Sequence, residues 1–378
     1  MSVKKPPRLV SLDAFRGLTM AGMVLVNNPG DWGHVYPPLL HAQWNGCTPT
    51  DLIFPFFLFI VGVSITLSRG TMGDPWSIVK RALVIFGLGM VLALYPRWDF
   101  SVVRIPGVLQ RIAVCYLVAA FLFRWTTPTH GNDDARRRAH GRTLALWSAT
   151  LTLGYWGVMT LIPVPGGAAG DLTPAGNLGA YIDRTIFGNH LWVQSKTWDP
   201  EGLLSTVPAL ATTLVGGVAG LWLGSRASGA RKALWMVAAG VAAVGIGLAW
   251  SLVFPLNKAL WTSSYVWFTG GAAAVFLALC YTLIDVKGWT AWSRPFVVLG
   301  LNAIALFVLS GLMTKFLGFH KVTGPDGTPI SLLRYTYVTW FVPLADPVNA
   351  SLLFALANLA VLFVILWFMD KRGWYLKA

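Results

Sequence analysis

The sequence predicts an all-α, polytopic integral membrane protein with about ten transmembrane helices. Hydrophobic residues make up 55% of its 378 residues, charged residues only 12%, and the mean hydropathy is +0.61. A soluble protein carries about a quarter charged residues. Apolar runs long enough to cross a bilayer, which takes roughly 20 residues, recur along the whole chain. They leave no room for a large soluble domain, so residues 1–378 are expected to form a single transmembrane domain.

The predicted spans follow one another with short connections. They cover residues 11–28, 51–68, 79–96, 106–124, 143–162, 204–224, 233–254, 264–284, 295–316 and 349–369. The first has the shortest apolar part and contains Asp13 and Arg16, which lie three apart on one helix face and are expected to form an ion pair. Thr50 is expected to cap the second span, with Asp51 in its first turn. Pro106 suits the first turn of the fourth.

Basic residues are distributed unevenly between the two sides of these spans. With the N-terminus in the cytoplasm, that side holds 20 of the 29 basic residues. They are Lys4, Lys5, Arg8, Arg16, Arg69, Lys80, Arg81, Arg124, Arg136, Arg137, Arg138, Arg142, Arg226, Arg231, Lys232, Lys287, Arg294, Lys371, Arg372 and Lys377. The positive-inside rule therefore predicts that both termini are cytoplasmic. The net charge of +14 is explained by these loops and does not indicate nucleic-acid binding.

His41 lies in a polar turn directly before the second span. Imidazole is the usual proton acceptor at neutral pH, so a histidine at a membrane mouth is a candidate catalytic base. The alternative is an interfacial or structural histidine. Cys47 is close enough in sequence for a Cys/His nucleophile, but no third orienting group is legible. The three cysteines form no disulfide framework or metal-binding spacing, and no metal is expected.

The outward turns hold further polar and aromatic residues that are candidates for substrate binding. The set is Trp44, Asn45, Asp51, Arg104, Gln110, Arg111, Asp183, Asp199, Glu201, Lys258 and Trp261. Gln110 and Arg111 fall about one turn inside the fourth span, where an unpaired charge is costly. Arg104 and Arg111 have a structural alternative, which is to pair with Asp99 or Asp183 and hold helices together. Asp199 and Glu201 also have a structural alternative, which is to be ordinary turn residues.

Ten short stretches in these regions together resemble one known family. They are SLDAFRG (11–17), VLVN (24–27), HAQWNG (41–46), DLIFP (51–55), VRIPGVLQR (103–111), LIPVPG (161–166), AYIDR (180–184), DPEG (199–202), PLNK (255–258) and DVKG (285–288). In this order and spacing they resemble the heparan-α-glucosaminide N-acetyltransferase family of transmembrane acyltransferases. One such match would be weak, whereas ten that run nearly end to end are specific.

The resemblance implies a transmembrane acyltransferase fold and a reaction. The family transfers acetyl from cytoplasmic acetyl-CoA to the amine of a terminal glucosamine across a membrane. Its active histidine matches His41 and its asparagine matches Asn27, although the doubling to Asn27 and Asn28 leaves open which one acts. Cys47 replaces the family's usual aliphatic residue. The family's large lumenal domain is missing, which implies a compact relative in the bacterial inner membrane and a free or short amino sugar as acceptor. A homodimer is also implied.

Amide formation from a thioester requires a neutral amine, which gives His41 two possible roles. It can take the ammonium proton as a general base, or it can attack first and carry the acetyl group. Asn27 or Asn28 can donate to the thioester oxygen, and Trp44, Trp198 or Trp261 can stack on a sugar ring. Two other functions stay open, which are O-acetylation of a glycan or cell-wall polymer and sugar transport. Transporters commonly show inverted repeats and broken helices, and neither is legible in the sequence.

Overall fold

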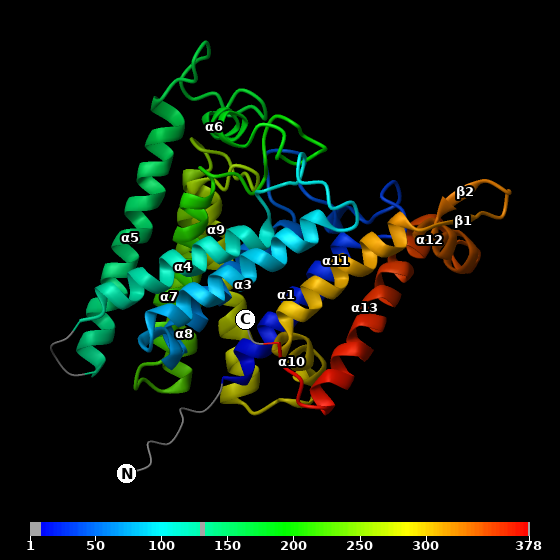
Figure 1. Cartoon of the computed structure of the whole chain (residues 1–378). Coiled ribbons are helices and arrows are strands. Elements are labelled where there is room, and N and C mark those ends of the chain that lie inside the picture. Colours follow the sequence, from blue (N-terminus) through cyan, green and yellow to red (C-terminus); the bar gives the residue numbers. More distant parts are fainter. Residues whose placement is uncertain (1–8, 129–132, 377–378) are drawn as a thin grey trace.

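The computed structural model describes residues 9–128 and 133–376 and is almost entirely helical (Figure 1). Its helices are α1 (Val10–Asn27), α2 (Ile53–Leu67), α3 (Pro75–Leu94), α4 (Val108–Thr126), α5 (Asp133–Leu161), α6 (Leu178–Phe187), α7 (Thr206–Leu223), α8 (Gly229–Trp250), α9 (Ser263–Tyr281), α10 (Arg294–Leu301), α11 (Ala303–Phe319), α12 (Leu332–Thr336) and α13 (Pro347–Lys371). The predicted all-α fold class is confirmed. Lys4, Lys5, Arg8 and Lys377, which entered the charge argument, lie outside the described residues.

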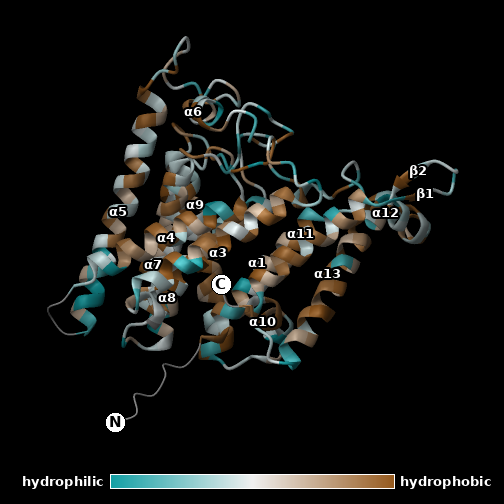
Figure 2. Ribbon diagram, viewed as in Figure 1, coloured by the Kyte–Doolittle hydropathy of each residue, from teal (hydrophilic) through white to brown (hydrophobic). Residues whose placement is uncertain are grey.

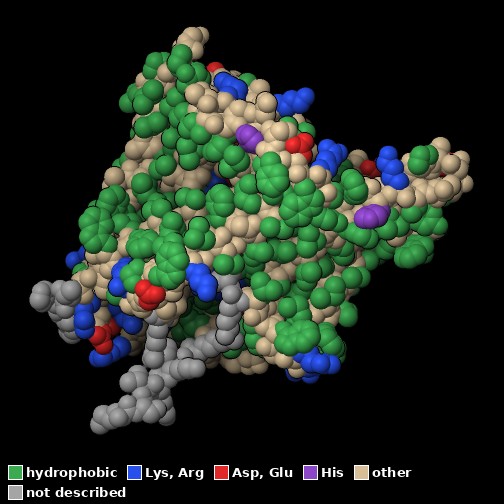
Figure 3. Space-filling view, viewed as in Figure 1, with side chains coloured by type: hydrophobic (Ala, Val, Ile, Leu, Met, Phe, Trp, Pro, Cys, Tyr) green, Lys and Arg blue, Asp and Glu red, His purple; other side chains and the backbone are tan. Residues whose placement is uncertain are grey.

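Nine predicted spans each correspond to one helix and the tenth, 295–316, to the pair α10 and α11; most of these helices can cross a membrane. Within the described ranges, eight helices are long and apolar enough, and a ninth is added if the bent pair α10 and α11 is one span. Hydrophobic residues dominate the helices, and hydrophilic ones gather at helix ends and in connections (Figure 2). On the visible face, hydrophobic side chains cover the middle and Lys and Arg lie mainly toward the edges (Figure 3). The protein is therefore a multi-pass membrane protein.

Two of the predicted spans depart from a simple crossing helix. Helix α1 is not among the eight, and it carries the charged residues Asp13 and Arg16 within its 18 residues. The predicted span 295–316 is bent by 71° between α10 and α11. At the bend, the buried Asn302 side chain donates to the Trp374 carbonyl (3.0 Å) and accepts from the Leu376 amide (2.9 Å). These bonds fasten the bend to the segment that follows α13.

Glycines allow two helix pairs to approach closely. A Cβ atom on Gly17 of α1 would lie 1.7 Å from the Phe296 carbonyl oxygen of α10. A Cβ atom on Gly62 of α2 would lie 1.8 Å from the Thr213 carbonyl oxygen of α7. Since no side chain fits at such separations, the glycines fix where α1 and α2 sit relative to their neighbours. Both helices line the cavity described below, with Arg16 and Asn27 on α1 and Ser64 on α2 among the lining residues.

The segments predicted as long outer loops contain regular structure of their own. Helix α6 lies between α5 and α7, and the Asn177 side chain caps it by accepting from the Ala180 amide (2.8 Å). Between α11 and α12, strands β1 (Lys321–Thr323) and β2 (Pro329–Ser331) form an antiparallel hairpin. Figure 1 shows α6 beyond one end of the helices and the hairpin with α12 projecting to the side.

Candidate active site

One large cavity runs along the inside of the helices. Its volume is about 780 Å³, within the roughly 300–1,000 Å³ typical of small-molecule sites. On α2 it is lined by residues from Ile53 to Ile65, a helical distance of about 18 Å at 1.5 Å per residue. The hydrocarbon core of a bilayer is about 30 Å thick. The stretch of α2 that lines the cavity is therefore longer than half of that thickness.

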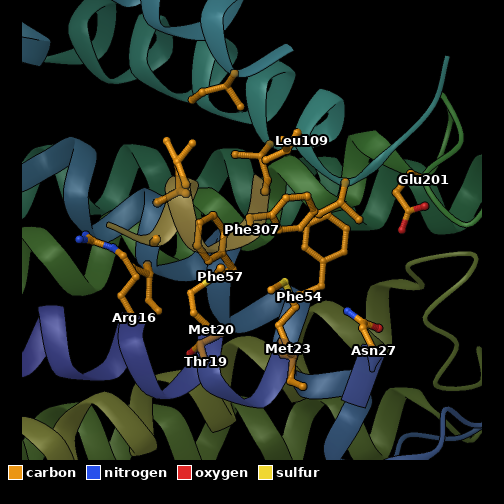
Figure 4. Close-up of a pocket in the computed structure, with 18 of the residues that line it drawn as sticks. Arg16, Thr19, Met20, Met23, Asn27, Phe54, Phe57, Leu109, Glu201 and Phe307 are labelled. Atoms are coloured by element: carbon orange, nitrogen blue, oxygen red, sulfur yellow. The ribbon is translucent and has the colours of Figure 1, made fainter. Parts of the chain in front are cut away.

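The two ends of the cavity are polar and its middle is apolar. Figure 4 shows Arg16 at one end of the pocket, Asn27 and Glu201 at the other, and methionine and phenylalanine side chains between them. We call these the Arg16 end and the His41 end. The Arg16 end is lined by Arg16, Ser64, Ser68, Thr71 and Arg81, and the His41 end by Asn27, His41, Trp44, Asp51, Arg104, Trp192, Trp198, Glu201 and Lys258.

Asp51 holds the turn that carries His41. The side chain is 1% exposed. One carboxylate oxygen contacts His41 Nδ1 (2.7 Å), and the other accepts from the Ala42 amide (3.0 Å), the Thr48 amide (3.0 Å) and the Thr48 hydroxyl (3.1 Å). The prediction that Thr50 caps this helix is wrong. Thr48 forms the capping box with Asp51, because a 3₁₀ turn (Pro49–Leu52) starts the helix earlier than expected.

The contact with Asp51 determines which nitrogen of His41 can act as a base. An ionised carboxylate only accepts hydrogen bonds, so Nδ1 of His41 carries the proton and donates it to Asp51. The lone pair then lies on Nε2. The His41 side chain is 47% exposed and lines the cavity. The dyad thus resembles the carboxylate-imidazole part of a catalytic triad, in which the acid fixes the tautomer and stabilises the imidazolium.

Lys258 lies against this dyad. Its Nζ is 3.1 Å from His41 Nδ1, 3.4 Å from His41 Nε2 and 3.6 Å from Asp51 Oδ1. Burial lowers the pKa of the Lys258 ammonium below its ordinary value, while the Asp51 and Glu201 carboxylates partly offset this effect. The site therefore places the Asp51 carboxylate, the His41 imidazole and the Lys258 ammonium around one point.

Charged and aromatic residues surround the opening at the His41 end. Arg104 Nε donates to Asp199 Oδ2 (2.8 Å), and its Nη2 also contacts Glu201. Burial opposes the charge on Arg104, but the Glu201 and Asp199 carboxylates raise the pKa of its guanidinium above the ordinary value. The rings of Trp44 and Trp198 meet edge to face with centroids 5.1 Å apart. This combination of flat apolar rings and charged groups suits a polar ring-shaped ligand.

The structure separates the two adjacent asparagines. Asn27 lines the cavity at the end of α1. Asn28 is 6% exposed, and its side chain donates to the Val24 carbonyl (2.7 Å) and the Ser310 hydroxyl (3.3 Å) and accepts from Thr314. The hydrogen-bonding groups of Asn28 are therefore occupied by the contact between α1 and α11, and only Asn27 is free to face a ligand.

Several candidates for substrate binding lie outside the lining of the cavity. Arg111 is 2% exposed, donates to the Gly202 carbonyl (3.1 Å) and the Ser205 hydroxyl (2.5 Å), and stands over the ring of Trp261, which has no exposed surface. Asp183 accepts from the Leu203 amide (2.9 Å), and burial raises its pKa to about 6. These residues hold the loop that carries Asp199 and Glu201.

Gln110 and Asn45 also make packing contacts. Gln110 Nε2 donates to the sulfur of Met90 (3.5 Å), and its amide fills the space beside Gly89 of α3. Asn45 Oδ1 accepts from the Asn257 side chain (3.2 Å), which joins the His41 turn to the Lys258 turn. The predicted alternative partner Asp99 bonds instead to Ser101.

The Cys47 thiol is an unsuitable nucleophile. Burial and the nearby Asp51 carboxylate raise the pKa of Cys47 to about 12, so the reactive thiolate is scarce at neutral pH. Its sulfur contacts the Thr48 carbonyl at 3.6 Å. Among the described residues no group of three His, Cys, Asp or Glu side chains has the geometry to hold a metal ion.

Sequence reasoning overlooked two parts of the cavity lining. Trp192 lies beside Trp198, with ring centroids 5.9 Å apart, and beneath Arg104. Arg16 was assigned only to an ion pair with Asp13, yet it also donates to the Ser64 hydroxyl (2.9 Å) and lines the cavity. Its position within an apolar run was the available signal, because charges there usually face a cavity or a partner.

The chain is similar in sequence to known proteins of one family. Residues 8–130 match the family described as "Heparan-alpha-glucosaminide N-acetyltransferase, catalytic". The chain is 33% identical to the heparan-alpha-glucosaminide N-acetyltransferase of Homo sapiens over 367 residues, covering 83% of this chain and 54% of that protein. It is also 33% identical to the Mus musculus protein of the same name over 365 residues, covering 83% and 55%. The chain thus spans just over half the length of the relatives it matches.

Proposed function

Because the chain belongs to the heparan-alpha-glucosaminide N-acetyltransferase family, we propose that it is a membrane acetyltransferase. Acetyl moves from acetyl-CoA, which enters at the Arg16 end, to the amine of glucosamine or a short amino sugar at the His41 end. The observation that carries the proposal is the single cavity lined by both Arg16 and His41. A donor and an acceptor on opposite sides of a membrane need such a shared space in order to react.

The charges at the Arg16 end suit the donor. CoA carries phosphates, which arginine binds through charge-assisted hydrogen bonds. Arg16 and Arg81 both line this end, and the hydroxyls of Ser64, Ser68 and Thr71 lie with them. The excess of basic residues favours a cytoplasmic position for this end, with both termini on that side of a bacterial inner membrane. The apolar middle of the cavity suits the neutral pantetheine arm.

The residues at the His41 end suit an amino sugar. The rings of Trp44, Trp192 and Trp198 offer apolar faces on which a pyranose ring stacks. Glu201 lines the cavity, where it can accept hydrogen bonds from hydroxyl groups, and Arg104 pairs with it. Asp199 is buried outside the lining and holds Arg104 in place. This site can hold the acceptor with its amine toward His41.

His41 is the proposed proton acceptor. The amine nitrogen attacks the acetyl carbonyl carbon, its proton passes to His41 Nε2, and the C–S bond breaks to release CoA as the thiol. Asp51 stabilises the imidazolium through Nδ1, and the Asn27 amide donates to the carbonyl oxygen as charge builds there. An acetyl-imidazole route would use the same nitrogen, so both routes require the tautomer that Asp51 selects.

The test is acetyl transfer by purified protein in lipid nanodiscs with labelled acetyl-CoA and glucosamine. His41→Ala is expected to lower turnover by roughly 10²–10⁴ while binding of acetyl-CoA persists. His34→Ala is the matched control, because His34 lies in the same loop and its side chain pairs with Asp31 (3.1 Å). Wild-type turnover in His41→Ala, or solute flux without any acetyl transfer, would overturn the proposal. The homodimer stays a prediction.

A further inference from the structure

The turn between α8 and α9 holds Lys258 rigidly against His41. Asn257 anchors this turn through its side chain, which accepts from the Leu260 amide (2.8 Å) and donates to Asn45 (3.2 Å). The Gly46 amide also donates to the Leu256 carbonyl (2.7 Å). The two turns are therefore fastened to each other, and the lysine and the histidine keep a fixed separation.

The ammonium of Lys258 lies over the face of the His41 ring. Nζ is almost equidistant from Nδ1 (3.1 Å) and Nε2 (3.4 Å). An atom so close to both nitrogens would collide with Cε1 if it lay in the ring plane, so it must lie above the plane. Both in-plane positions then stay free for other partners, with Nδ1 bonded to Asp51 and Nε2 open to the cavity.

This position is suitable for a donor to the reacting carbonyl. The carbon under attack must lie beside Nε2, because the proton of the amine passes to that nitrogen. Its oxygen then comes within reach of Nζ, whose own side chain is 23% exposed and lines the cavity. Donors that are already aimed at developing negative charge give large rate effects, since nothing has to reorganise.

We propose that Lys258 is a catalytic residue whose ammonium stabilises the oxyanion of the tetrahedral intermediate and keeps the His41 imidazole neutral before attack. The inference rests on the proposed acetyl transfer. When the amine attacks, the π electrons of the carbonyl move to oxygen, which Lys258 then hydrogen-bonds. When the oxyanion collapses, the C–S bond breaks, and the thiolate takes the proton that His41 holds.

The charged groups around Lys258 are consistent with this role. Burial lowers the pKa of the Lys258 ammonium, whereas the Asp51 and Glu201 carboxylates favour its charged form. Arg104 pairs with Glu201, and Cys47, another titratable group nearby, stays a neutral thiol. Asp51 favours the imidazolium of His41, and the Lys258 cation opposes it. Neutral imidazole is the form that can accept a proton, so the Lys258 cation offsets the effect that the Asp51 carboxylate has on His41.

The experiment compares Lys258→Met and Lys258→Arg with Lys196→Met, a control at an exposed lysine of the loop after α6. Lys258→Met is expected to lower kcat by roughly 10²–10³ with unchanged affinity for acetyl-CoA. The acidic limb of its pH–rate profile should move up by roughly one pH unit, because a cation near His41 is lost. Lys258→Arg should keep the wild-type limb. Every variant is assayed with the same amino sugar, so the effect of protonating the sugar amine on the rate is the same in each pH–rate profile.

The outcomes separate the possible failures. An unchanged kcat in Lys258→Met, or a lower kcat with an unmoved acidic limb, overturns the catalytic role and leaves the proposed function intact. Absence of acetyl transfer by the wild-type protein overturns the proposed function, and this inference with it. Thermal unfolding of each variant in nanodiscs shows whether a loss of rate comes from misfolding.

Discussion

Replacing Asp51 by Asn tests the electrostatic logic of the site with a minimal change in shape. Asp51 Oδ1 contacts His41 Nδ1 at 2.7 Å, and Oδ2 accepts from Ala42 and Thr48. In the variant, the carboxamide oxygen is expected to take the Oδ2 position, because two backbone amides and a hydroxyl point at it. The NH₂ group must then face His41 and donate to Nδ1.

That reversal places the proton of His41 on the wrong nitrogen. Nδ1 becomes the acceptor, Nε2 carries the proton, and no lone pair faces the cavity. The neutral carboxamide of the variant also no longer stabilises the His41 imidazolium. In a serine-protease triad, the equivalent change lowers kcat by about 10⁴, and general-base catalysis is worth roughly 10²–10⁴. We therefore expect the Asp51→Asn change to raise the barrier by about 3–5 kcal/mol.

The assay is acetyl transfer at saturating acetyl-CoA, together with direct binding of acetyl-CoA. Turnover should fall by at least about a hundredfold, and donor affinity should persist because the Arg16 end is untouched. Thermal unfolding should change little, since the hydrogen bonds to Oδ2 are retained. A turnover within about threefold of wild type would refute the reasoning, because it would mean that the tautomer of His41 does not limit the reaction.

Three further predictions concern neighbouring parts of the structure. Asn27→Ala should lower acetyl transfer by roughly 10²–10³ without loss of thermal stability, whereas Asn28→Ala should lower the unfolding temperature, because its side chain bonds α1 to α11. Gly17→Ala should destabilise the protein by about 3 kcal/mol, because its Cβ would lie 1.7 Å from a backbone oxygen of α10; Gly87→Ala, with no atom within 4 Å of its Cβ, should leave thermal unfolding nearly unchanged or slightly improved. Burial raises the pKa of Asp183 to about 6, so the folded state binds its proton more tightly than the unfolded state does. The free energy that proton binding by Asp183 contributes to folding is therefore lost as pH rises from about 4 to 6. The stability of wild type relative to Asp183→Asn should fall over that interval, and a difference that stays constant with pH would contradict the raised pKa of Asp183.

The sequence by itself was sufficient for the fold class and for the catalytic histidine hypothesis. Membrane helices are apolar over about 20 residues, a local property that no distant contact can hide, so each predicted span corresponds to a helix or, for 295–316, to a bent pair of helices. His41 was conspicuous because it lies directly before an apolar run and imidazole is the usual proton acceptor at neutral pH. The ten family-like stretches then supplied a reaction for it.

The roles of the other polar residues depended on the tertiary structure. Asn27 and Asn28 are adjacent and chemically identical, yet one faces the cavity and the other bonds α11, which lies almost three hundred residues away. Arg104 and Arg111 are chemically identical as well, but the first lines the cavity while the second is buried against the ring of Trp261. The direction of a side chain is set by the neighbours that its helix meets, and local composition does not contain that information.

The arrangement around His41 illustrates the same division. Asp51 is ten residues from His41, and Lys258 is more than two hundred residues away, yet all three meet within hydrogen-bonding or ion-pair distance. The sequence alone shows that His41, Asp51 and Lys258 lie near the ends of predicted membrane helices. Only the packing of the turns through Asn45 and Asn257 decided that the three lie around one point. Long-range electrostatics requires coordinates, whereas hydrophobic length can be read from the chain.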